Sequence, residues 1–411
     1  MGDSVSIVLV GVGGYGALYL EALMREPADR RARLVGVVDP HMPQSALVGE
    51  LRARGVPEYP DLAAFFARER ADLAVISSPI HRHCEQTCGA LEHGAHVLCE
   101  KPAAATVQDV DRMIRAREKA GRLVAVGYQW SFCTAIQSLK RDIAAGMYGA
   151  ARRLKTLCLW PRDESYYRRN QWAGRQRDDA GAWVLDSPLN NAMAHDLHNL
   201  LYLLGPGVER SAQPVEVVAE LYQANAIENF DTAAVRIHAD AGANAEVEIL
   251  FYGSHAVGED FGPVFSLEFD GGSVEYAGGG TPIVGRRAGA AEKVYGSPHD
   301  EPQVRKLWTC VAAAAEGGEV PCGLEAARSQ TVCMNGAQDS VERVVDIPMG
   351  LVRVEPRAAG RLTWVPGLAE TWQRCYGAGA LPSEMGVPWA RAGRRVELAQ
   401  YQYFPSAGAG G

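Results

Sequence analysis

The sequence lacks the features of a membrane, secreted or nucleic-acid-binding protein. No uninterrupted apolar run in its 411 residues approaches the roughly 20 residues that a membrane helix needs. The first residues contain no basic segment and no small-residue cleavage site, so export is not signalled and we expect a cytoplasmic protein. The 41 basic and 49 acidic residues form no basic block, which argues against nucleic-acid binding driven by charge.

The sequence also lacks a convincing disulfide or metal-binding pattern. Its nine cysteines are odd in number and lie in apparently structured segments, which favours buried free thiols in a reducing compartment. Cys84 and Cys88 are four residues apart on an expected helix, with His81 and His83 nearby. Structural zinc sites usually show two paired ligand clusters, and only one is present here. We therefore expect no bound metal.

A regular alternation of elements runs through residues 1–127. The length and a hydrophobic content of 47% predict a globular protein of two or three domains. Short β-branched runs alternate with stretches of helical spacing; the expected strands are 7–10, 34–38, 73–77, 96–99 and 123–127, and two of the helical stretches are 62–70 and 107–120. This alternation predicts an α/β domain with a doubly wound parallel sheet and helices on both faces.

The pattern changes after residue 127. Period-2 alternation is typical of half-buried antiparallel strands, and we expect such strands at 153–160, 215–223, 232–239, 245–252, 264–269 and 273–276. Helical stretches at 135–145, 303–315 and 324–341 accompany them. We therefore predict an α+β domain with an open, mainly antiparallel sheet over residues 128–345. Residues 346–411 mix Pro, Gly, Trp and Tyr without periodicity and are expected to form an extended C-terminal arm.

A glycine-rich turn lies between the first expected strand and a helical stretch. Its residues are Gly11, Gly13, Gly14, Tyr15 and Gly16. Glycines allow a tight turn and close approach of the backbone to a pyrophosphate, while the helix N-terminus supplies N–H groups and a positive dipole. The order of strand, glycines and helix predicts a dinucleotide site. The alternative is a glycine turn in an unrelated α/β protein.

Asp39 ends the second expected strand, near the offset of about 20 residues at which dinucleotide sites carry an acidic residue. Its carboxylate can accept hydrogen bonds from an adenosine ribose diol and would repel a 2′-phosphate. The next residues, Pro40, His41 and Met42, include no arginine that would bind such a phosphate. We therefore expect NAD in preference to NADP.

Two further stretches resemble a known family. Residues 78–83 read Ser-Pro-Ile-His-Arg-His, and residues 90–102 end in Cys-Glu-Lys-Pro. Together with the glycine turn they resemble the Gfo/Idh/MocA oxidoreductases, which typically show TPNxxH and then ALxxGKHVxxEKP. The resemblance implies a Rossmann domain, an open sheet that carries substrate and often subunit contacts, and oxidation or reduction of a sugar or cyclitol hydroxyl. By this match the nucleotide site is expected to include Ser78, Pro79, His83, Glu100 and Lys101.

Lys101 takes the place of the lysine that the family sets beside nicotinamide and substrate. An ammonium at the end of a parallel strand can hold a substrate hydroxyl and stabilise developing alkoxide charge. The ordinary alternative is a surface lysine. The chain has only six lysines, and this one lies between Glu100 and Pro102 after an expected buried strand, so we favour a catalytic role.

The second part of the family signature reads DxGxHxxD and runs into a helix that ends in LxG. Counting back from Leu204-Gly205, His195 matches the histidine that serves as general base in the family's sugar and inositol dehydrogenases. Asn191 and His198 stand where the family has aspartates. On one helix the three residues would share a face, so Asn191 is a candidate catalytic residue that orients the base, and His198 a candidate substrate contact. Without the carboxylate the base is weaker unless Asp186 or Asp196 compensates.

Aromatic residues supply the remaining candidate substrate contacts. Tyr128 follows the last expected strand of the first domain, where the family places residues lining the cleft, and Trp172 lies in a polar aromatic loop before Asp186. Aromatic platforms suit the C–H face of a sugar ring. The same loop contains Arg162, Tyr166 and Arg169, although such loops are as often plain surface.

Three functional hypotheses follow. The first is an NAD-dependent oxidoreductase that acts on a sugar, sugar derivative or cyclitol hydroxyl by hydride transfer to nicotinamide. The second is an enzyme that keeps its NAD tightly bound and recycles it in a net non-redox epimerisation or glycoside cleavage. The third is a nucleotide-binding subunit whose chemistry has decayed at Asn191 and His198. Because an open sheet would leave a large apolar face in water, we also expect a homodimer or homotetramer.

Overall fold

The computed structural model describes residues 4–25, 31–242 and 246–406, and the chain divides into two compact units. The first unit comprises residues 1–104, 108–133 and 301–328, and the second comprises residues 105–107, 134–300 and 329–411. Residues 301–328 were predicted in the second domain. They join the first because helix α9 (Arg305–Glu316) contacts its central strands.

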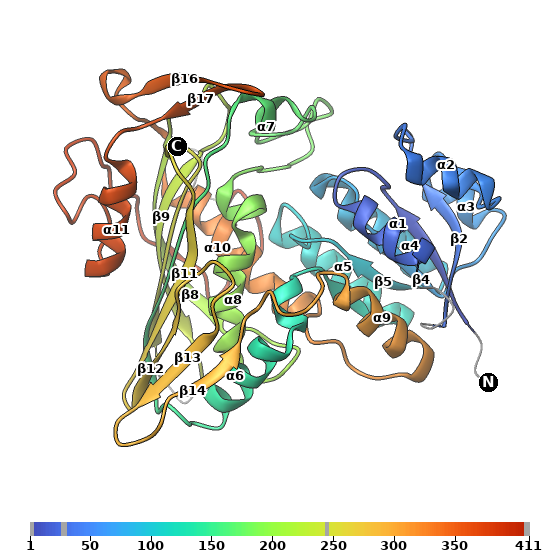
Figure 1. The fold of residues 1–411 in the computed structure, drawn as a ribbon, viewed down its shortest axis with the longest axis horizontal. Coiled ribbons are helices and arrows are strands. Elements are labelled where there is room, and N and C mark those ends of the chain that lie inside the picture. Colours follow the sequence, from blue (N-terminus) through green and yellow to red (C-terminus); the bar gives the residue numbers. More distant parts are fainter. Residues whose placement is uncertain (1–3, 26–30, 243–245, 407–411) are drawn as a thin grey trace. The chain divides into compact units, whose positions relative to one another are not determined.

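The first unit is built on a six-stranded parallel sheet with the order β3-β2-β1-β4-β5-β6 (Figure 1). Its strands are β1 (Val5–Val10), β2 (Ala32–Val38), β3 (Glu58–Tyr59), β4 (Leu73–Ile76), β5 (His96–Cys99) and β6 (Val124–Val126). Its helices, besides α9, are α1 (Gly16–Arg25), α2 (Ala46–Ala53), α3 (Leu62–Phe66), α4 (His83–Glu92) and α5 (Val107–Ala120). This is the strand order of a Rossmann fold and confirms the predicted doubly wound sheet.

The second unit is built on a ten-stranded sheet with the order β14-β13-β12-β11-β7-β10-β9-β8-β15, and β18 pairs with β8. Its strands are β7 (Ala151–Leu159), β8 (Gln213–Gln223), β9 (Thr232–Asp240), β10 (Glu246–Ser254), β11 (Phe261–Phe269), β12 (Gly272–Tyr276), β13 (Ile283–Arg287), β14 (Lys293–Gly296), β15 (Val345–Asp346) and β18 (Val396–Glu397). Two pairs, β7–β10 and β8–β15, are parallel and the other pairings are antiparallel. The predicted mainly antiparallel sheet is confirmed.

Helices cover one face of this sheet. They are α6 (Thr134–Ala144), α8 (Ala194–Leu203) and α10 (Leu324–Ser340), whose first residues belong to the first unit (Figure 1). Side chains alternate along β7, so Cys158 points to this helical face while Leu157 and Leu159 point to the other. The helices therefore bury one of the two apolar faces that period-2 patterning creates.

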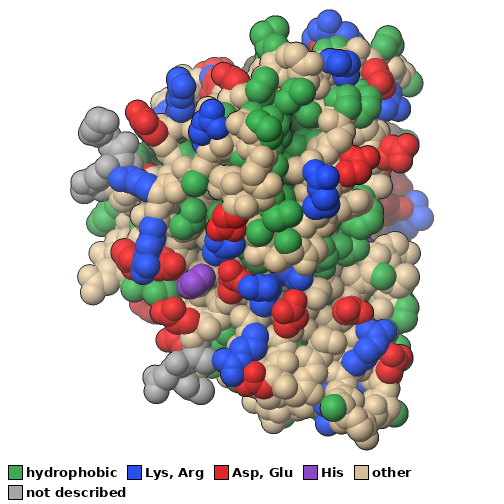
Figure 2. All heavy atoms as spheres, turned by 90° about the vertical axis from the view of Figure 1, so that its left-hand side faces the viewer, with side chains coloured by type: hydrophobic (Ala, Val, Ile, Leu, Met, Phe, Trp, Pro, Cys, Tyr) green, Lys and Arg blue, Asp and Glu red, His purple; other side chains and the backbone are tan. Residues whose placement is uncertain are grey.

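The C-terminal arm covers part of the other face. Contrary to the expectation of an irregular extended segment, it contains a hairpin of β16 (Arg353–Arg357) and β17 (Gly360–Trp364), followed by helix α11 (Leu368–Ala378). Arm residues Leu368, Trp372, Cys375 and Leu381 join strand residues such as Leu157, Tyr222, Leu250 and Tyr252 in one buried cluster. Figure 2 looks onto this side of the second unit and shows hydrophobic side chains gathered in its upper half.

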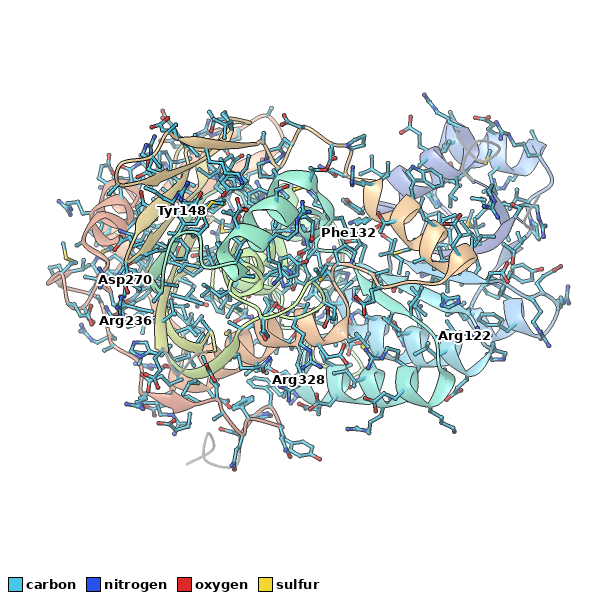
Figure 3. The ribbon with its side chains drawn as sticks, turned by 90° about the horizontal axis from the view of Figure 1, so that it is seen from below. Arg122, Phe132, Tyr148, Arg236, Asp270 and Arg328 are labelled. Atoms are coloured by element: carbon cyan, nitrogen blue, oxygen red, sulfur yellow. The ribbon has the colours of Figure 1, made fainter. Side chains whose placement is uncertain are left out.

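Polar contacts also fix the arm to the sheet. The Trp372 indole nitrogen donates to the Ala233 carbonyl at 3.1 Å, and the Tyr252 hydroxyl donates to Ala380 O at 3.0 Å. Arg236, labelled in Figure 3, pairs with Glu384 of the arm at 2.5 Å. The prediction of a homodimer or homotetramer assumed that this sheet face was uncovered, and the arm removes that reason for the part of the face that it covers. The oligomeric state stays a prediction.

All nine cysteines are buried and carry free thiols, as predicted. Within the described ranges, no helix has both the length and the apolar character needed to cross a bilayer. In the same residues, no three His, Cys, Asp or Glu side chains are grouped so that they could hold a metal ion.

Candidate functional site

The glycine-rich turn has the conformation that a dinucleotide site needs. Gly11 has a φ of +80°, and a Cβ there would lie 2.7 Å from Ser77 O. A Cβ on Gly16 would lie 2.0 Å from Gly11 O, so both positions require glycine. A Cβ on Gly13 would meet nothing within 4 Å. The turn is therefore closed on the strand side and open over Gly13, which fits the approach of a pyrophosphate.

Asp39 lies beside this turn because β2 pairs with β1. Its Oδ2 accepts from the Val12 amide at 3.0 Å, and its Oδ1 accepts from the His41 amide at 2.9 Å. The half-buried carboxylate thus ties the glycine turn to the end of β2. Each oxygen retains acceptor capacity for a ribose hydroxyl, since a carboxylate oxygen can accept more than one hydrogen bond.

Ser78 and Pro79 lie at the end of β4, next to the glycine turn. The Ser78 hydroxyl donates to Gln86 Oε1 at 2.5 Å, and Pro79 begins a 3₁₀ turn over Ile80–Arg82. Tyr15 donates its hydroxyl to Gln129 Oε1 at 3.0 Å. Burial raises the pKa of Tyr15, and the nearby Glu100 charge raises it further, so the phenol stays neutral. The fold therefore gathers the predicted nucleotide-site residues from β1, β2 and β4 at one edge of the sheet.

His83 was expected at the nucleotide site and instead lies in the interior. Its side chain is 1% exposed, with Nδ1 2.8 Å from Pro102 O and Nε2 2.9 Å from Ser78 O. Burial lowers its pKa despite both carbonyls, and a neutral imidazole has one N–H to donate. His83 thus lies between the two motif stretches and donates to one of the two carbonyls.

Glu100, also expected at the nucleotide site, has a buried side chain. Its Oε1 accepts at 2.5 Å from both the Tyr19 hydroxyl and Lys306 Nζ, and its Oε2 accepts from the Lys101 amide at 3.1 Å. Burial raises the Glu100 pKa, but Lys306 outweighs that effect and holds it below its ordinary value. A Cβ on Gly127 would lie 2.7 Å from this carboxylate, so glycine makes the room that Glu100 occupies.

Lys306 was missed by sequence reasoning. It lies on α9, is 1% exposed, and also donates to Gly127 O at 3.0 Å. Burial lowers its pKa against the opposing attraction of Glu100. The sequence held one indication of its role. Lys306 occupies a position on the apolar face of an amphipathic helix, where a buried lysine needs a charged partner.

Lys101 and Tyr128 differ in access within the first unit. Lys101 is partly exposed at the end of β5, as a residue that meets a ligand must be. Tyr128 is 0% exposed, and burial raises the pKa of its phenol well above the ordinary value. The expected aromatic platform is thus a buried residue in this structure.

The expected single helix carrying Asn191 and His195 is broken. Residues Pro188–Ala192 form a π-helical turn capped by Ser187, and α8 begins only at Ala194. Asn191 and His195 are both partly exposed, whereas the residues around His195 on α8 are buried. The prediction of one continuous face is wrong in this respect, although both side chains remain accessible.

His198 lies on the buried side of α8. It is 1% exposed and stacks on Tyr202 with 5.5 Å between ring centroids. Burial, aided by the Lys140 charge, lowers its pKa to about 3, so the ring is neutral. It is an interior residue, which removes the basis for expecting it to contact substrate.

Asp186 organises the polar groups beside Asn191. Its Oδ1 accepts from Asn191 Nδ2 at 2.7 Å, its Oδ2 accepts from the Gly174 amide at 2.7 Å, and Arg169 lies 3.6 Å from Oδ2. The carboxylate that the family signature places at position 191 is thus present one hydrogen bond away. Trp172 is partly exposed, and its ring lies 5.3 Å from the Arg169 guanidinium.

Known proteins similar in sequence support the Rossmann fold of the first unit. Residues 5–128 match a family model described as an oxidoreductase family with an NAD-binding Rossmann fold. The 2,7-anhydro-N-acetylneuraminate hydratase of Mediterraneibacter gnavus is 32% identical over 146 residues, which is 36% of this chain and 37% of the relative. The inositol 2-dehydrogenase of Burkholderia multivorans is 28% identical over 203 residues, which is 49% of this chain and 55% of the relative.

A solved structure extends the likeness in fold to both units. The WlbA dehydrogenase from Bordetella pertussis, in complex with NADH and UDP-GlcNAcA, gives a TM-score of 0.65 at 21% identity, covering 82% of this chain and 98% of that one. The curated relatives are matched over only about a third to a half of their length, and the family match lies in the first unit. Residues 5–128 therefore match the NAD-binding Rossmann domain of the Gfo/Idh/MocA oxidoreductases.

Proposed function

We propose that this chain is an NAD-dependent oxidoreductase that acts on a hydroxyl of a sugar, sugar derivative or cyclitol. The observation that carries the proposal is the glycine turn, open over Gly13 and tied at Val12 to the Asp39 carboxylate. Relatives named inositol 2-dehydrogenase and D-glucoside 3-dehydrogenase, the latter from Escherichia coli, support the substrate class. The open antiparallel sheet of the second unit fits a substrate-binding role.

The chain's own residues divide the work. When bound, NAD supplies a nicotinamide ring that accepts hydride from the carbon being oxidised. Gly11, Gly13, Gly14 and Gly16 would form the turn that holds the pyrophosphate, and Asp39 would accept hydrogen bonds from the ribose diol. Lys101 donates to the substrate oxygen and stabilises its developing negative charge. His195 takes the hydroxyl proton, with Asn191 fixing the geometry of the site.

Substitutions at the two proton-handling positions test the proposal. Lys101→Ala and His195→Ala should each lower kcat by about 100-fold or more on an identified polyol, measured as NADH absorbance. His195→Ala should leave NADH affinity unchanged. Exposed Lys119 and His299 offer matched controls, and Lys119→Ala and His299→Ala should keep wild-type rates. Near wild-type turnover in both site variants would show that the assignment is wrong.

A second candidate retains NAD and regenerates it within each cycle. The relative named a hydratase favours it, because hydration involves no net redox change. The two candidates differ in one measurement. Bulk NADH formation on a sugar or cyclitol panel supports the dehydrogenase, whereas product formation with NAD retained through purification and no NADH release supports the recycling enzyme.

The nine buried free thiols support a reducing compartment, so we place the chain in the cytoplasm. Fractionation of cells that express the full chain tests this placement, which recovery in an oxidising compartment would overturn.

A further inference from the structure

A cluster of cations and aromatic rings lies in the second unit before Asp186. Tyr166, on the short helix α7 (Glu164–Arg168), is flanked by Arg162 and Arg169, whose guanidinium carbons lie 5.0 Å and 3.6 Å from its ring centroid. The Trp160 ring lies 5.7 Å from Arg162 and the Trp172 ring 5.3 Å from Arg169. Stacking on aromatic rings holds both guanidinium planes while leaving their edges for hydrogen bonds.

The position of α7 is fixed by other residues as well as by Arg169, whose Nη1 donates to the Tyr166 carbonyl at 2.6 Å. Asp163 caps the helix by accepting from the Ser165 and Tyr166 amides. Glu164 pairs with Arg361 of β17 at 2.5 Å, and α7 lies beside β17 in Figure 1. The arginines are therefore held on a supported scaffold.

The positive charge of this cluster is only partly compensated within the protein. Arg162 forms no ion pair with any described residue, and its guanidinium donates to the main-chain carbonyl of Pro161 at 3.1 Å. Its Nε is buried without a hydrogen-bond partner among those residues. Arg169 has one carboxylate, Asp186, at 3.6 Å, and that group already accepts from Gly174 and Asn191. Among the described residues, the two cations are thus paired with a single carboxylate, which contacts Arg169 alone and also accepts from Gly174 and Asn191.

His255 adds an acceptor to the same cluster. It is 2% exposed, its ring lies 5.5 Å from the Tyr166 ring, and its Nδ1 lies 2.8 Å from Trp160 O. Burial lowers its pKa to about 3, with Arg162 and Arg169 contributing, so the ring is neutral and Nδ1 carries the proton donated to Trp160. Nε2 is then an acceptor, and no described residue donates to it. A buried acceptor of this kind suits a ligand hydroxyl.

The cluster adjoins the segment that carries His195. The Asp186 carboxylate contacts Arg169 through one oxygen and Asn191 through the other, so the two side chains meet the same group. Asn191 lies four residues before His195 in the sequence. The Asp186–Asn191 pair therefore connects Arg169 to the segment that carries His195.

We propose that Arg162 and Arg169 bind an anionic group of the substrate, a carboxylate or a phosphate carried by the sugar. The proposal rests on the proposed function and narrows its substrate class to acidic sugars. Planar guanidinium groups match the oxygens of both anions and bind them through paired hydrogen bonds. The group stands apart from the oxidised hydroxyl, so it positions the ring and takes no part in proton transfer.

Direct binding to the full chain with saturating NAD tests this proposal by calorimetry. The probes are D-glucuronate for a carboxylate, D-glucose 6-phosphate for a phosphate and D-glucose as the neutral reference. At least one anionic probe should bind about 10-fold or more tightly than D-glucose, since a hydrogen bond to a charged group contributes ~1.5–3 kcal/mol. The anion that binds more tightly identifies the substrate's charged group as a carboxylate or a phosphate. Equal affinity for all three probes, or no binding of either anion, would overturn the proposal.

Variants locate the binding to the two arginines. Arg162→Gln and Arg169→Gln should each weaken the preferred anion by about 10-fold or more and leave D-glucose and NADH affinity unchanged. Arg168→Gln, whose parent side chain is 75% exposed, is the matched control and should bind as wild type. If a glutamine variant fails to fold, Arg162→Lys and Arg169→Lys keep the charge and should show a smaller loss. Wild-type anion affinity in the folded variants would contradict the proposal.

Turnover is scored separately from binding. Anion binding that depends on the arginines, with no NADH formed and no product released, would refute the proposed oxidoreductase function while leaving this binding site standing. NADH formation from neutral sugars alone, with no preference for anions, would refute the anion-binding site and support the oxidoreductase function.

Discussion

The Asn191 amide donates a hydrogen bond to Asp186, with 2.7 Å between Nδ2 and Oδ1. Asp186→Asn removes the negative charge that holds this amide, and we expect kcat to fall by about 100-fold, because small misplacements at a catalytic site cost that much. NADH affinity should not change. Steady-state rates and fluorescence titration with NADH check the two parts.

The matched control for Asp186 is Asp179, whose side chain is 75% exposed and pairs with Arg175. Asp179→Asn should keep wild-type turnover. Since Asp186 is buried, thermal unfolding of each variant separates a lost catalytic contact from a lost fold. A folded Asp186→Asn protein with wild-type kcat would contradict this prediction.

Asp39 should set the choice of nucleotide. Asp39→Ala removes the acceptor for the ribose diol and the charge that repels a 2′-phosphate, so we expect NADH affinity to fall by about 10-fold and NADPH affinity to rise. Calorimetry with both nucleotides measures the change without any substrate. The exposed Asp61→Ala serves as control. An unchanged NADH to NADPH ratio would show that Asp39 does not discriminate.

The buried ion pair between Lys306 and Glu100 should dominate the stability of the first unit. Lys306→Met leaves the Glu100 carboxylate buried without its cation, and we expect a loss of about 3–5 kcal/mol in the free energy of unfolding. The double variant Lys306→Met with Glu100→Gln should recover part of that loss, because the uncompensated charge is gone. Urea unfolding followed by tryptophan fluorescence measures both, and equal losses in the single and double variants would argue against the pair.

His198 should make the second unit sensitive to acid. Its pKa in the folded state is about 3, against about 6.5 in the unfolded chain, so its contribution to stability is full above pH 6.5. That contribution falls by ~1.4 kcal/mol per pH unit between about 6.5 and 3, because the unfolded chain takes up a proton that the folded chain does not. His198→Gln should reduce the loss between pH 7 and pH 5 by about 2 kcal/mol in denaturant unfolding.

Trp372 should anchor the C-terminal arm. It is fully buried and donates to Ala233 O, so Trp372→Phe and Trp372→Ala should lower the free energy of unfolding progressively, with the alanine variant losing about 3–5 kcal/mol. Met349, 91% exposed on the same arm, provides the control Met349→Ala, which should be neutral. If Trp372→Ala lowers the free energy of unfolding no more than Met349→Ala does, the arm is only loosely held.

Local pattern explains what could be predicted. The strand His96–Cys99 and the helix Val107–Ala120 were predicted with the correct first and last residues. Buried strands and amphipathic helices can be identified from the hydrophobic pattern of neighbouring residues. The glycine turn was equally local. The arm's helix was hidden among Gly and Pro residues, although Leu368, Trp372 and Cys375 show the i, i+4, i+7 spacing of a buried face.

Long-range pairing explains what could not be predicted. The partner of Glu100 lies 206 residues further along the chain, and no spacing rule relates Glu100 to Lys306. The interior positions of His83 and His198 likewise depend on which side of a helix packs inward. Motif matching finds the right segment in such cases, but only packing decides which of its side chains reaches a ligand.

The arm keeps part of the second unit's sheet covered when the protein is diluted. A sheet face covered by a separate subunit is exposed whenever the complex dissociates, so its stability depends on protein concentration. Here the covering layer is covalently attached and cannot be diluted away. A chain cut before Leu368 should therefore expose this part of the sheet and aggregate.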